Sequence, residues 1–277
     1  MNVLEIDDVH VTHQRRGQEP VRAVRGVSLA VAPGQIVGLV GESGCGKSSL
    51  ARVAVGLAAP TSGAVRFEGR PLAASRLRAR AKDALGLQMI FQNPYASLSP
   101  RRTIGSQLLD GVRTPLSGPE RAAEAIRLLQ LVGLDPDSRG RYPNQFSGGQ
   151  RQRLAIARAL GARPSLVIAD EPVTALDAFS SAQIVTLLTG LVRELDMGML
   201  FISHDLSLVR AIADETAVMY AGEIVERGPS ERVWNEPAHD YTKTLIAAIP
   251  VIGPKTVRRK AAGATSAAIQ ERNTHVG

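Results

Sequence analysis

The stretch that decides the fold is IVGLVGESGCGKSS, residues 36–49. Its first part, IVGLV, is an unbroken apolar, β-branched run of the kind found in strands that are buried on both faces. The following GESGCGKSS fits the pattern G-x-x-x-x-G-K-[ST], with Gly41, Gly46, Lys47 and Ser48 at the fixed positions. A helical pattern begins at Lys47. A buried strand, a glycine-rich loop and a helix in this order predict a phosphate-binding loop in an α/β fold.

The chemistry of this loop is that of a nucleoside triphosphate site. Glycines let the backbone curl so that successive N–H groups point inward, and the helix N-terminus adds partial positive charge. We expect Lys47 to bridge the β- and γ-phosphates and the Ser48 hydroxyl to bind Mg²⁺. Cys45 is interpreted as a passive small residue rather than a redox group. The other loop residues predicted to contact the nucleotide are Glu42, Ser43, Gly44, Cys45 and Ser49.

The rest of the chain alternates apolar runs with helical patterns, which predicts an α/β fold around a mostly parallel sheet. Strands are predicted at 166–170 (LVIAD), 199–203 (MLFIS) and 217–222 (AVMYAG), and helices at 47–57, 119–132, 150–160 and 180–195. Alternating stretches within the first 35 residues and at 63–69 predict short antiparallel strands. From 71 to 163 the strand signal disappears, which predicts an inserted helical lobe.

Two carboxylates follow the LVIAD strand. Asp170 lies at the predicted carboxyl end of the strand, where it is placed to hold hydrated Mg²⁺. Glu171 follows directly and is placed to orient or deprotonate an attacking water. The alternative is that the pair only binds metal. Beside a phosphate-binding loop, the pair predicts nucleotide hydrolysis.

A second anion-binding signal lies in FSGGQRQR, residues 146–153. Ser147 and Gln150 have the S-x-x-Q spacing of a capping box, and the residues that follow repeat apolar positions at helical spacing. Ser147, Gly148 and Gly149 are therefore expected to expose N–H groups at a helix start. This second site has no lysine or magnesium ligand of its own.

In this motif the chain resembles the ATP-binding subunits of ABC transporters, whose signature LSGGQ reads FSGGQ here. The resemblance covers about residues 3–250 and includes Gln92 in MIFQNP, ALD at 175–177 and His204 in ISHD, all in the family order. It implies a P-loop NTPase (RecA-like) core with an N-terminal antiparallel β subdomain and an inserted α-helical subdomain.

The resemblance also sets the expected domain boundaries. An ATP-binding domain is expected over 1–250, with its helical subdomain at about 71–163 and a family-specific segment at about 229–250. Residues 251–277 are polar and alanine-rich, and we expect a disordered tail there.

The resemblance implies that two such subunits pair head to tail. The signature residues of one subunit then cap the γ-phosphate of ATP that lies on the phosphate-binding loop of the other. The residues implied to act across this interface are Ser147, Gly148, Gly149 and Gln150, with Asp177 coupling the two sites. Asp177 has a second interpretation as the cap of a helix that starts near Ala178.

The remaining family roles concern hydrolysis and the base. By resemblance, Gln92 senses Mg²⁺ and the γ-phosphate, and His204 holds the γ-phosphate and Glu171 in line. The aromatic residue that stacks on adenine in the family is replaced by His13 in VHVTHQRR. His13 is interpreted either as a smaller stacking group or as a structural residue.

The C-terminal part resembles one class, the dipeptide, oligopeptide and nickel importers. In NEPAHDYTKTLIAAIP, residues 235–250, Pro237, His239, Tyr241 and Thr242 match a Pro-x-His-Pro-Tyr-Thr stretch of that class, and Asp240 replaces its second proline. The class implies ATP-driven transmembrane uptake of peptides or a related small solute. Its implied partners are a second ATP-binding subunit, permease subunits and, indirectly, a substrate-binding protein, with the chain on the cytoplasmic face of the cell membrane.

Composition limits the alternatives. No apolar run approaches the roughly 20 residues that span a bilayer, and the acidic start does not resemble a signal peptide. Cys45 is the only cysteine, which excludes an internal disulfide and a cysteine-rich metal cluster. The net charge is +7, but the basic residues are scattered along the sequence, and the aromatic content of 4% is low for stacking on nucleic-acid bases. Two alternatives stay open, a soluble ABC-type ATPase acting on nucleic acid or ribosomes and a nucleotide-binding regulator without turnover.

Overall fold

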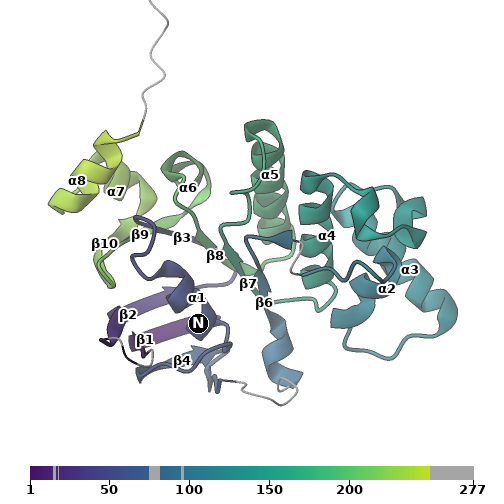
Figure 1. Cartoon of the computed structure of the whole chain (residues 1–277), viewed down its shortest axis with the longest axis horizontal. Coiled ribbons are helices and arrows are strands. Elements are labelled where there is room, and N and C mark those ends of the chain that lie inside the picture. The colour runs from purple at the N-terminus through teal and green to yellow at the C-terminus, as the bar shows by residue number, and fades with distance from the viewer. Residues whose placement is uncertain (15–16, 18, 75–81, 95–96, 250–277) are drawn as a thin grey trace, which may run out of the picture.

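The computed structural model describes residues 1–14, 17, 19–74, 82–94 and 97–249. The predicted tail at 251–277 lies outside the described residues. Within them the chain forms two sheets, with helices around the larger one (Figure 1).

The larger sheet carries the predicted buried strands. It has six strands in the order β10-β9-β3-β8-β7-β6. Neighbouring strands are parallel except for β10, which runs antiparallel to β9. Every residue of β3, β7 and β8 is buried, which explains their unbroken apolar sequences. The bounds are β3 (Ile36–Val40), β6 (Leu87–Ile90), β7 (Leu166–Asp170), β8 (Gly198–Ile202), β9 (Glu215–Tyr220) and β10 (Glu223–Pro229).

The smaller sheet is antiparallel, in the order β2-β1-β4-β5, and confirms the prediction for the N-terminal part. Helix α1 packs between the two sheets, where its Leu50 shares one apolar core with Leu29 of β2 and Ile168 of β7. The helix is shorter than predicted because Gly56 adopts φ 72° and the chain turns back. The bounds are β1 (Leu4–His13), β2 (Val21–Val31), β4 (Ser62–Phe67), β5 (Arg70–Pro71) and α1 (Lys47–Ala54).

The other face of the larger sheet is covered by helices that share a second apolar core. In Figure 1, α2, α3 and α4 form a lobe beside β6, and α7 and α8 lie at the opposite end beside β10. The helices are α2 (Ile104–Leu108), α3 (Gly118–Leu131), α4 (Gly148–Leu160), α5 (Ala178–Glu194), α6 (Leu206–Ile212), α7 (Ser230–Asn235) and α8 (Asp240–Ala247). Short 3-10 turns are η1 (Lys82–Gly86), η3 (Leu109–Gly111), η4 (Pro136–Gly140) and η5 (Pro143–Gln145).

The predicted absence of strands from 71 to 163 is wrong. Strand β6 lies inside that range and pairs in parallel with β7, from Leu87 opposite Leu166 to Ile90 opposite Ala169. It has only four residues, two of them half-buried, because it forms the edge of the sheet. So short a run carries little local signal, and its ladder partner lies far away in the sequence. The first α-helix of the lobe begins only at Ile104.

The parallel pairing brings the loops of interest to one edge. Leu39 of β3 and Asp170 of β7 both lie opposite Ile202 of β8. The phosphate-binding loop (residues 41–49), Glu171 and the residues after β8 therefore leave the sheet at the same carboxyl edge. Ligand sites of open α/β sheets form at this edge.

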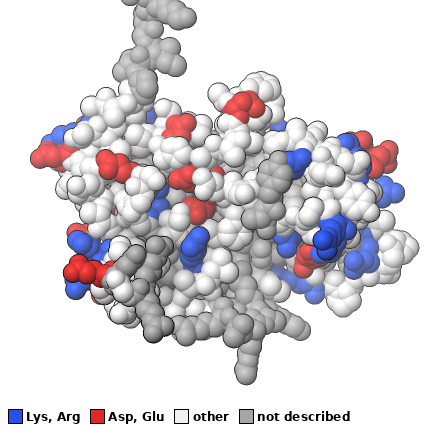
Figure 2. Space-filling model, viewed as in Figure 1, with Lys and Arg blue, Asp and Glu red and all other residues white. Residues whose placement is uncertain are grey.

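None of the described helices is both long and apolar enough to cross a membrane. On the face in Figure 2, most basic side chains lie over the right-hand part, with acidic side chains among them, and most acidic side chains lie near the centre and left.

Candidate nucleotide-binding site

The phosphate-binding loop joins β3 to α1 and depends on two glycines. Gly41 has φ 152°, and a Cβ there would lie 2.1 Å from the carbonyl oxygen of Met219. Gly46 has φ 114°, and a Cβ there would lie 2.1 Å from the carbonyl oxygen of Ala23. Any side chain at either position would collide with backbone, so the glycines are required by the loop itself.

Lys47 points back into the loop. Its ammonium donates to the carbonyl oxygens of Gly41 at 2.7 Å and Glu42 at 2.8 Å, and it lies 3.8 Å from Cys45 Sγ. The residue is 4% exposed. A buried cation that carbonyl groups hold at the N-terminus of a helix is a suitable partner for phosphate oxygens.

Ser48 and Asp170 meet beside the loop. The Ser48 hydroxyl donates to Asp170 Oδ1 at 3.2 Å. Burial raises the pKa of the Asp170 carboxyl above its ordinary value, and the hydrogen bond from Ser48 offsets this only in part. The described residues contain no group of three or more His, Cys, Asp or Glu side chains that would hold a metal alone. One hydroxyl and one carboxylate fit Mg²⁺, which keeps several waters and takes phosphate oxygens as its other ligands.

Three side chains contact one carboxylate oxygen of Glu171. Its Oε2 accepts from Thr174 Oγ1 at 3.0 Å and from Gln92 Nε2 at 3.3 Å, and it lies 3.3 Å from His204 Nδ1. The Glu171 backbone has φ 48°, a left-handed conformation that non-glycine residues rarely adopt. Its N–H donates to the carbonyl oxygen of Ile202 at 2.9 Å, so a β8 contact holds the strained residue.

The site thus joins three segments that are distant in sequence. Gln92 follows β6, Glu171 follows β7 and His204 follows β8. The His204 side chain is 53% exposed and that of Glu171 is 19% exposed. The carboxylate is therefore sheltered, while the imidazole is open to solvent.

His13 lies at the end of β1 and next to α1. Its Nε2 is 2.9 Å from the hydroxyl of Ser49. This contact places the imidazole beside the loop, but it also gives His13 a structural role. Stacking on adenine stays a prediction.

The signature residues lie elsewhere. Ser147 caps α4, Gln150 N donates to Ser147 Oγ at 3.3 Å, and Ser147 N donates to Gln150 Oε1 at 2.9 Å, which confirms the capping box. Cβ atoms built at Gly148 and Gly149 would meet Leu176 and Ser180 rather than the loop. Figure 1 shows α4 separated from α1 by strands of the larger sheet.

Asp177 is the N-cap of α5. Its carboxylate accepts from the Ser180 N–H at 2.9 Å and from the Ser180 hydroxyl at 2.8 Å. These two hydrogen bonds hold the pKa of the Asp177 carboxyl below its ordinary value. The capping interpretation is confirmed, and a coupling role across an interface stays a prediction.

Two contacts of the site were not predicted from the sequence. Thr174 donates to Glu171, and only its spacing of three residues after the glutamate hints at that contact. Tyr241 of α8 accepts a hydrogen bond from the Glu42 N–H at 3.1 Å, although 199 positions separate the two. No local signal indicates this second contact.

Two protein families match the chain. The family described as "ABC transporter" matches residues 24–174, and the one described as "Oligopeptide/dipeptide transporter, C-terminal region" matches residues 225–275. The two ranges hold the phosphate-binding loop with Glu171, and the segment with Tyr241.

Curated relatives agree. The di/tripeptide transport ATP-binding protein DppF of Pseudomonas aeruginosa is 42% identical over 247 residues, which cover 88% of this chain and 76% of that protein. The probable peptide ABC transporter ATP-binding protein y4tS of Sinorhizobium fredii is 48% identical over 240 residues, covering 86% and 68%. The dipeptide transport ATP-binding protein DppF of Escherichia coli is 43% identical over 242 residues, covering 87% and 72%.

Solved structures share the fold. A dimeric, post-hydrolysis structure of the ATP-binding cassette MJ0796 bound to ADP and Pi has a TM-score of 0.71 at 28% identity and covers 82% of this chain and 98% of its own. The structure of cbiO1 from Clostridium perfringens has a TM-score of 0.73 at 24% identity, covers 85% and 91%, and bears on the fold alone.

Proposed function

The chain belongs to the ABC transporter ATP-binding family, and we propose that its two anion-binding motifs complete each other's sites between two such subunits. It is an ATP-binding and ATP-hydrolysing subunit of the dipeptide and oligopeptide class of ABC importers. The observation that carries the mechanism is the convergence of Gln92, Thr174 and His204 on Glu171, beside the phosphate-binding loop.

The positions of the two motifs support pairing. Leu154 of α4 belongs to one apolar core and Leu50 of α1 to the other, so the signature residues at the start of α4 lie apart from the phosphate-binding loop of the same chain (Figure 1). A second subunit, either a copy of this chain or a related one, supplies the missing cap. ATP favours the closed pair because it contacts both halves only there.

Hydrolysis is assigned to the residues at the carboxyl edge. Lys47 neutralises charge on the β- and γ-phosphates. Mg²⁺, when bound, neutralises further charge on the phosphates, and Ser48, Asp170 and Gln92 are the residues that would hold it. Glu171 orients and deprotonates the attacking water, and His204 fixes the direction of the carboxylate.

We assign binding of the adenine base to His13. Its imidazole, beside Ser49, offers an adenine ring a flat face at the entrance to the loop. This face is smaller than the aromatic ring that the family uses there, so a modest preference for adenine over other bases is expected.

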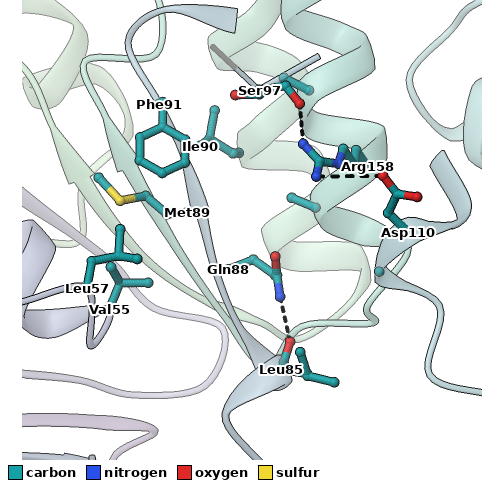
Figure 3. Close-up of a pocket in the computed structure, with 13 residues that line it drawn as sticks. Val55, Leu57, Leu85, Gln88, Met89, Ile90, Phe91, Ser97, Asp110 and Arg158 are labelled. Atoms are coloured by element: carbon teal, nitrogen blue, oxygen red, sulfur yellow. Dashed lines mark hydrogen bonds and ion pairs between the residues drawn. The ribbon is translucent and has the colours of Figure 1, made fainter. Parts of the chain in front are cut away.

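The permease is assigned to a hollow beside Gln92. This cavity, of about 360 Å³, lies between β6 and α4, and its lining includes Leu57, Met89, Phe91 and Arg158 (Figure 3). Leu57 is 51% and Phe91 39% exposed, so two exposed large apolar side chains line the same hollow, as is typical of an apolar patch that binds a partner. Arg158 donates to the Ser97 carbonyl and pairs with Asp110 at 3.8 Å, so the polar wall is fixed.

A short permease helix in this hollow would touch the residue directly before Gln92. Movement of the permease helix would then be transmitted to Glu171 through the side chain of Gln92. A change at Glu171 would be transmitted to the permease helix by the same route. The solute would come to the permease from a substrate-binding protein, and the chain would lie on the cytoplasmic face of the membrane.

Transport is favoured over the nucleic-acid alternative by the match of residues 225–275 to a transporter-specific region. The face shown in Figure 2 agrees with this assignment, because acidic side chains lie beside its basic ones, whereas a nucleic-acid site needs a concentrated basic surface.

The test uses Glu171→Gln in the complex of the chain with its permease. Turnover of ATP should fall by about 10²-fold or more, while ATP-stabilised pairing of the subunits, measured by size-exclusion chromatography, persists. Glu236→Gln, at an exposed position on the other end of the sheet, is the control and should match the wild type. Wild-type turnover in Glu171→Gln would remove the glutamate from the proposed role.

A further inference from the structure

The C-terminal segment contacts the phosphate-binding loop through one side chain. The hydroxyl of Tyr241, on α8, accepts the N–H of Glu42 at 3.1 Å. The Tyr241 ring packs on Tyr220 at the end of β9, with ring centroids 4.2 Å apart. The hydroxyl is therefore held at the loop by a contact on the ring behind it.

The peptide group that Tyr241 touches is also one that holds Lys47. This peptide consists of the Gly41 carbonyl and the Glu42 N–H. The carbonyl accepts from Lys47 Nζ at 2.7 Å, while the N–H donates to Tyr241. In a planar trans peptide these two groups point in opposite directions. Tyr241 and Lys47 therefore form hydrogen bonds at opposite edges of one rigid peptide group.

The next carbonyl strengthens this coupling. Lys47 Nζ also donates to the Glu42 carbonyl at 2.8 Å. Both carbonyl groups that accept from the ammonium thus flank the N–H that Tyr241 fixes. Rotation of the peptide between Gly41 and Glu42 would move one acceptor and tilt the other.

Tyr241 is itself anchored from below. Its own N–H donates to His239 Nδ1 at 3.1 Å, which caps α8. The buried carboxylate of Glu226, on β10, accepts the N–H groups of Ala238 at 2.8 Å and His239 at 3.0 Å. The stretch that marks the peptide class is therefore fastened to the sheet at one end and to the loop at the other.

We propose that Tyr241 is a positioning residue for ATP binding, which fixes the peptide between Gly41 and Glu42 and through it the ammonium of Lys47. The proposal rests on the proposed function of the loop as the ATP site. A loop that is already in its binding conformation loses less entropy when the triphosphate arrives, so the hydroxyl increases affinity without touching the nucleotide.

The experiment compares Tyr241→Phe with Tyr220→Phe in the full chain. Tyr241→Phe removes the hydroxyl and keeps the ring on Tyr220. Tyr220→Phe is the matched control, because it removes a hydroxyl from the same ring pair that makes no hydrogen bond within the described residues. Calorimetric titration with Mg·ATP should show a dissociation constant about three- to tenfold higher in Tyr241→Phe, the effect of one lost hydrogen bond, and wild-type affinity in Tyr220→Phe.

A second readout separates positioning from general loosening. The Glu42 amide should exchange with deuterium several-fold faster in nucleotide-free Tyr241→Phe, while amides of β3 and β8 keep wild-type protection, as measured by NMR. Unchanged Glu42 exchange, or unchanged ATP affinity, in Tyr241→Phe overturns the proposal. Failure of the wild-type chain to bind ATP would instead refute the proposed function of the loop.

Discussion

His204 Nδ1 lies 3.3 Å from Glu171 Oε2, at the carboxyl edge of two adjacent parallel strands. The contact joins the segment after β8 to the segment after β7, and the ladder between these strands fixes the spacing. Glu171 holds a left-handed backbone there, with φ 48°. A strained glutamate that three other side chains reach is arranged for chemistry rather than for stability.

Removal of the imidazole should therefore affect turnover more than binding. We expect His204→Ala to lower the rate of ATP hydrolysis by about 10²-fold or more, because the carboxylate loses the group that directs it. The dissociation constant for Mg·ATP should change by less, about threefold, because the loop and Lys47 are intact. His10→Ala is the control, since His10 makes a similar 3.3 Å contact with Asp8 in the smaller sheet. Near-wild-type turnover in His204→Ala would contradict the assignment.

Substitution of Asp170 should raise the stability of the empty chain and impair its response to Mg²⁺. Burial raises the pKa of its carboxyl above the ordinary 3.8, so the folded chain takes up this proton at a higher pH than the unfolded chain. Stability therefore falls as the pH rises from 3.8 through the raised pKa, and at neutral pH the buried charge destabilises the empty chain. Asp170→Asn removes that charge. We expect its thermal unfolding midpoint, without nucleotide, to rise by about 2 °C or more.

The same substitution should abolish the benefit of Mg²⁺. In the wild type, Mg·ATP should raise the unfolding midpoint more than ATP in EDTA does, and this difference should shrink as the pH falls toward the raised pKa of Asp170. In Asp170→Asn the two ligands should act alike at all pH values. Asp137→Asn, whose side chain is 93% exposed, controls for a general charge effect. A full Mg²⁺ response in Asp170→Asn would assign the metal to other residues.

Ser147 has a local role and a proposed role across the interface, which two substitutions separate. Ser147→Ala loses the N-cap of α4 and should cost about 1 kcal/mol of unfolding free energy. Ser147→Asp keeps a good N-cap but places a negative charge where the partner's γ-phosphate is expected. It should retain near-wild-type stability and lose ATP-driven pairing, as seen by size-exclusion chromatography.

Ser117→Ala controls for the loss of a capping serine, because Ser117 forms the same kind of capping box at α3. It should lower stability and leave pairing intact. Pairing by Ser147→Asp at wild-type ATP concentrations would place the signature residues outside the interface.

Much of this site could be predicted because its signals are local. The glycines, Lys47 and Ser48 lie in one short loop, and the carboxylates directly follow an apolar run that is buried on both faces. Strand β6 escaped prediction because four residues at a sheet edge gain their stability from β7, not from their own sequence. The Tyr241 contact escaped because it arises only when α8 packs beside β9, far from the loop in sequence.

The anchor of Tyr241 leads to the last prediction. Glu226 is 7% exposed, and burial opposes its ionisation. The N–H groups of Ala238 and His239, with the Thr242 hydroxyl and the charge of Arg232, together outweigh burial and leave the pKa of its carboxyl below the ordinary 4.5. An amide in place of the carboxylate would face one of these N–H groups with its own NH₂. Glu226→Gln should therefore lower the free energy of unfolding by about 1–3 kcal/mol at neutral pH, measured by urea denaturation.

The pH dependence of this effect has a definite sign. Because the folded-state pKa of Glu226 is depressed, its stabilising contribution is fully present above pH 4.5 and is lost as the pH falls through the lower folded-state value. The gap between wild type and Glu226→Gln should close in that acidic window and nowhere above it. Glu223→Gln, on the same strand with a 57% exposed side chain, should show no such gap.

Since Glu226 fastens the start of α8, Glu226→Gln should also weaken Mg·ATP binding in the direction expected for Tyr241→Phe. A destabilised Glu226→Gln that binds ATP with wild-type affinity would mean that Tyr241 keeps its place at the loop without this anchor.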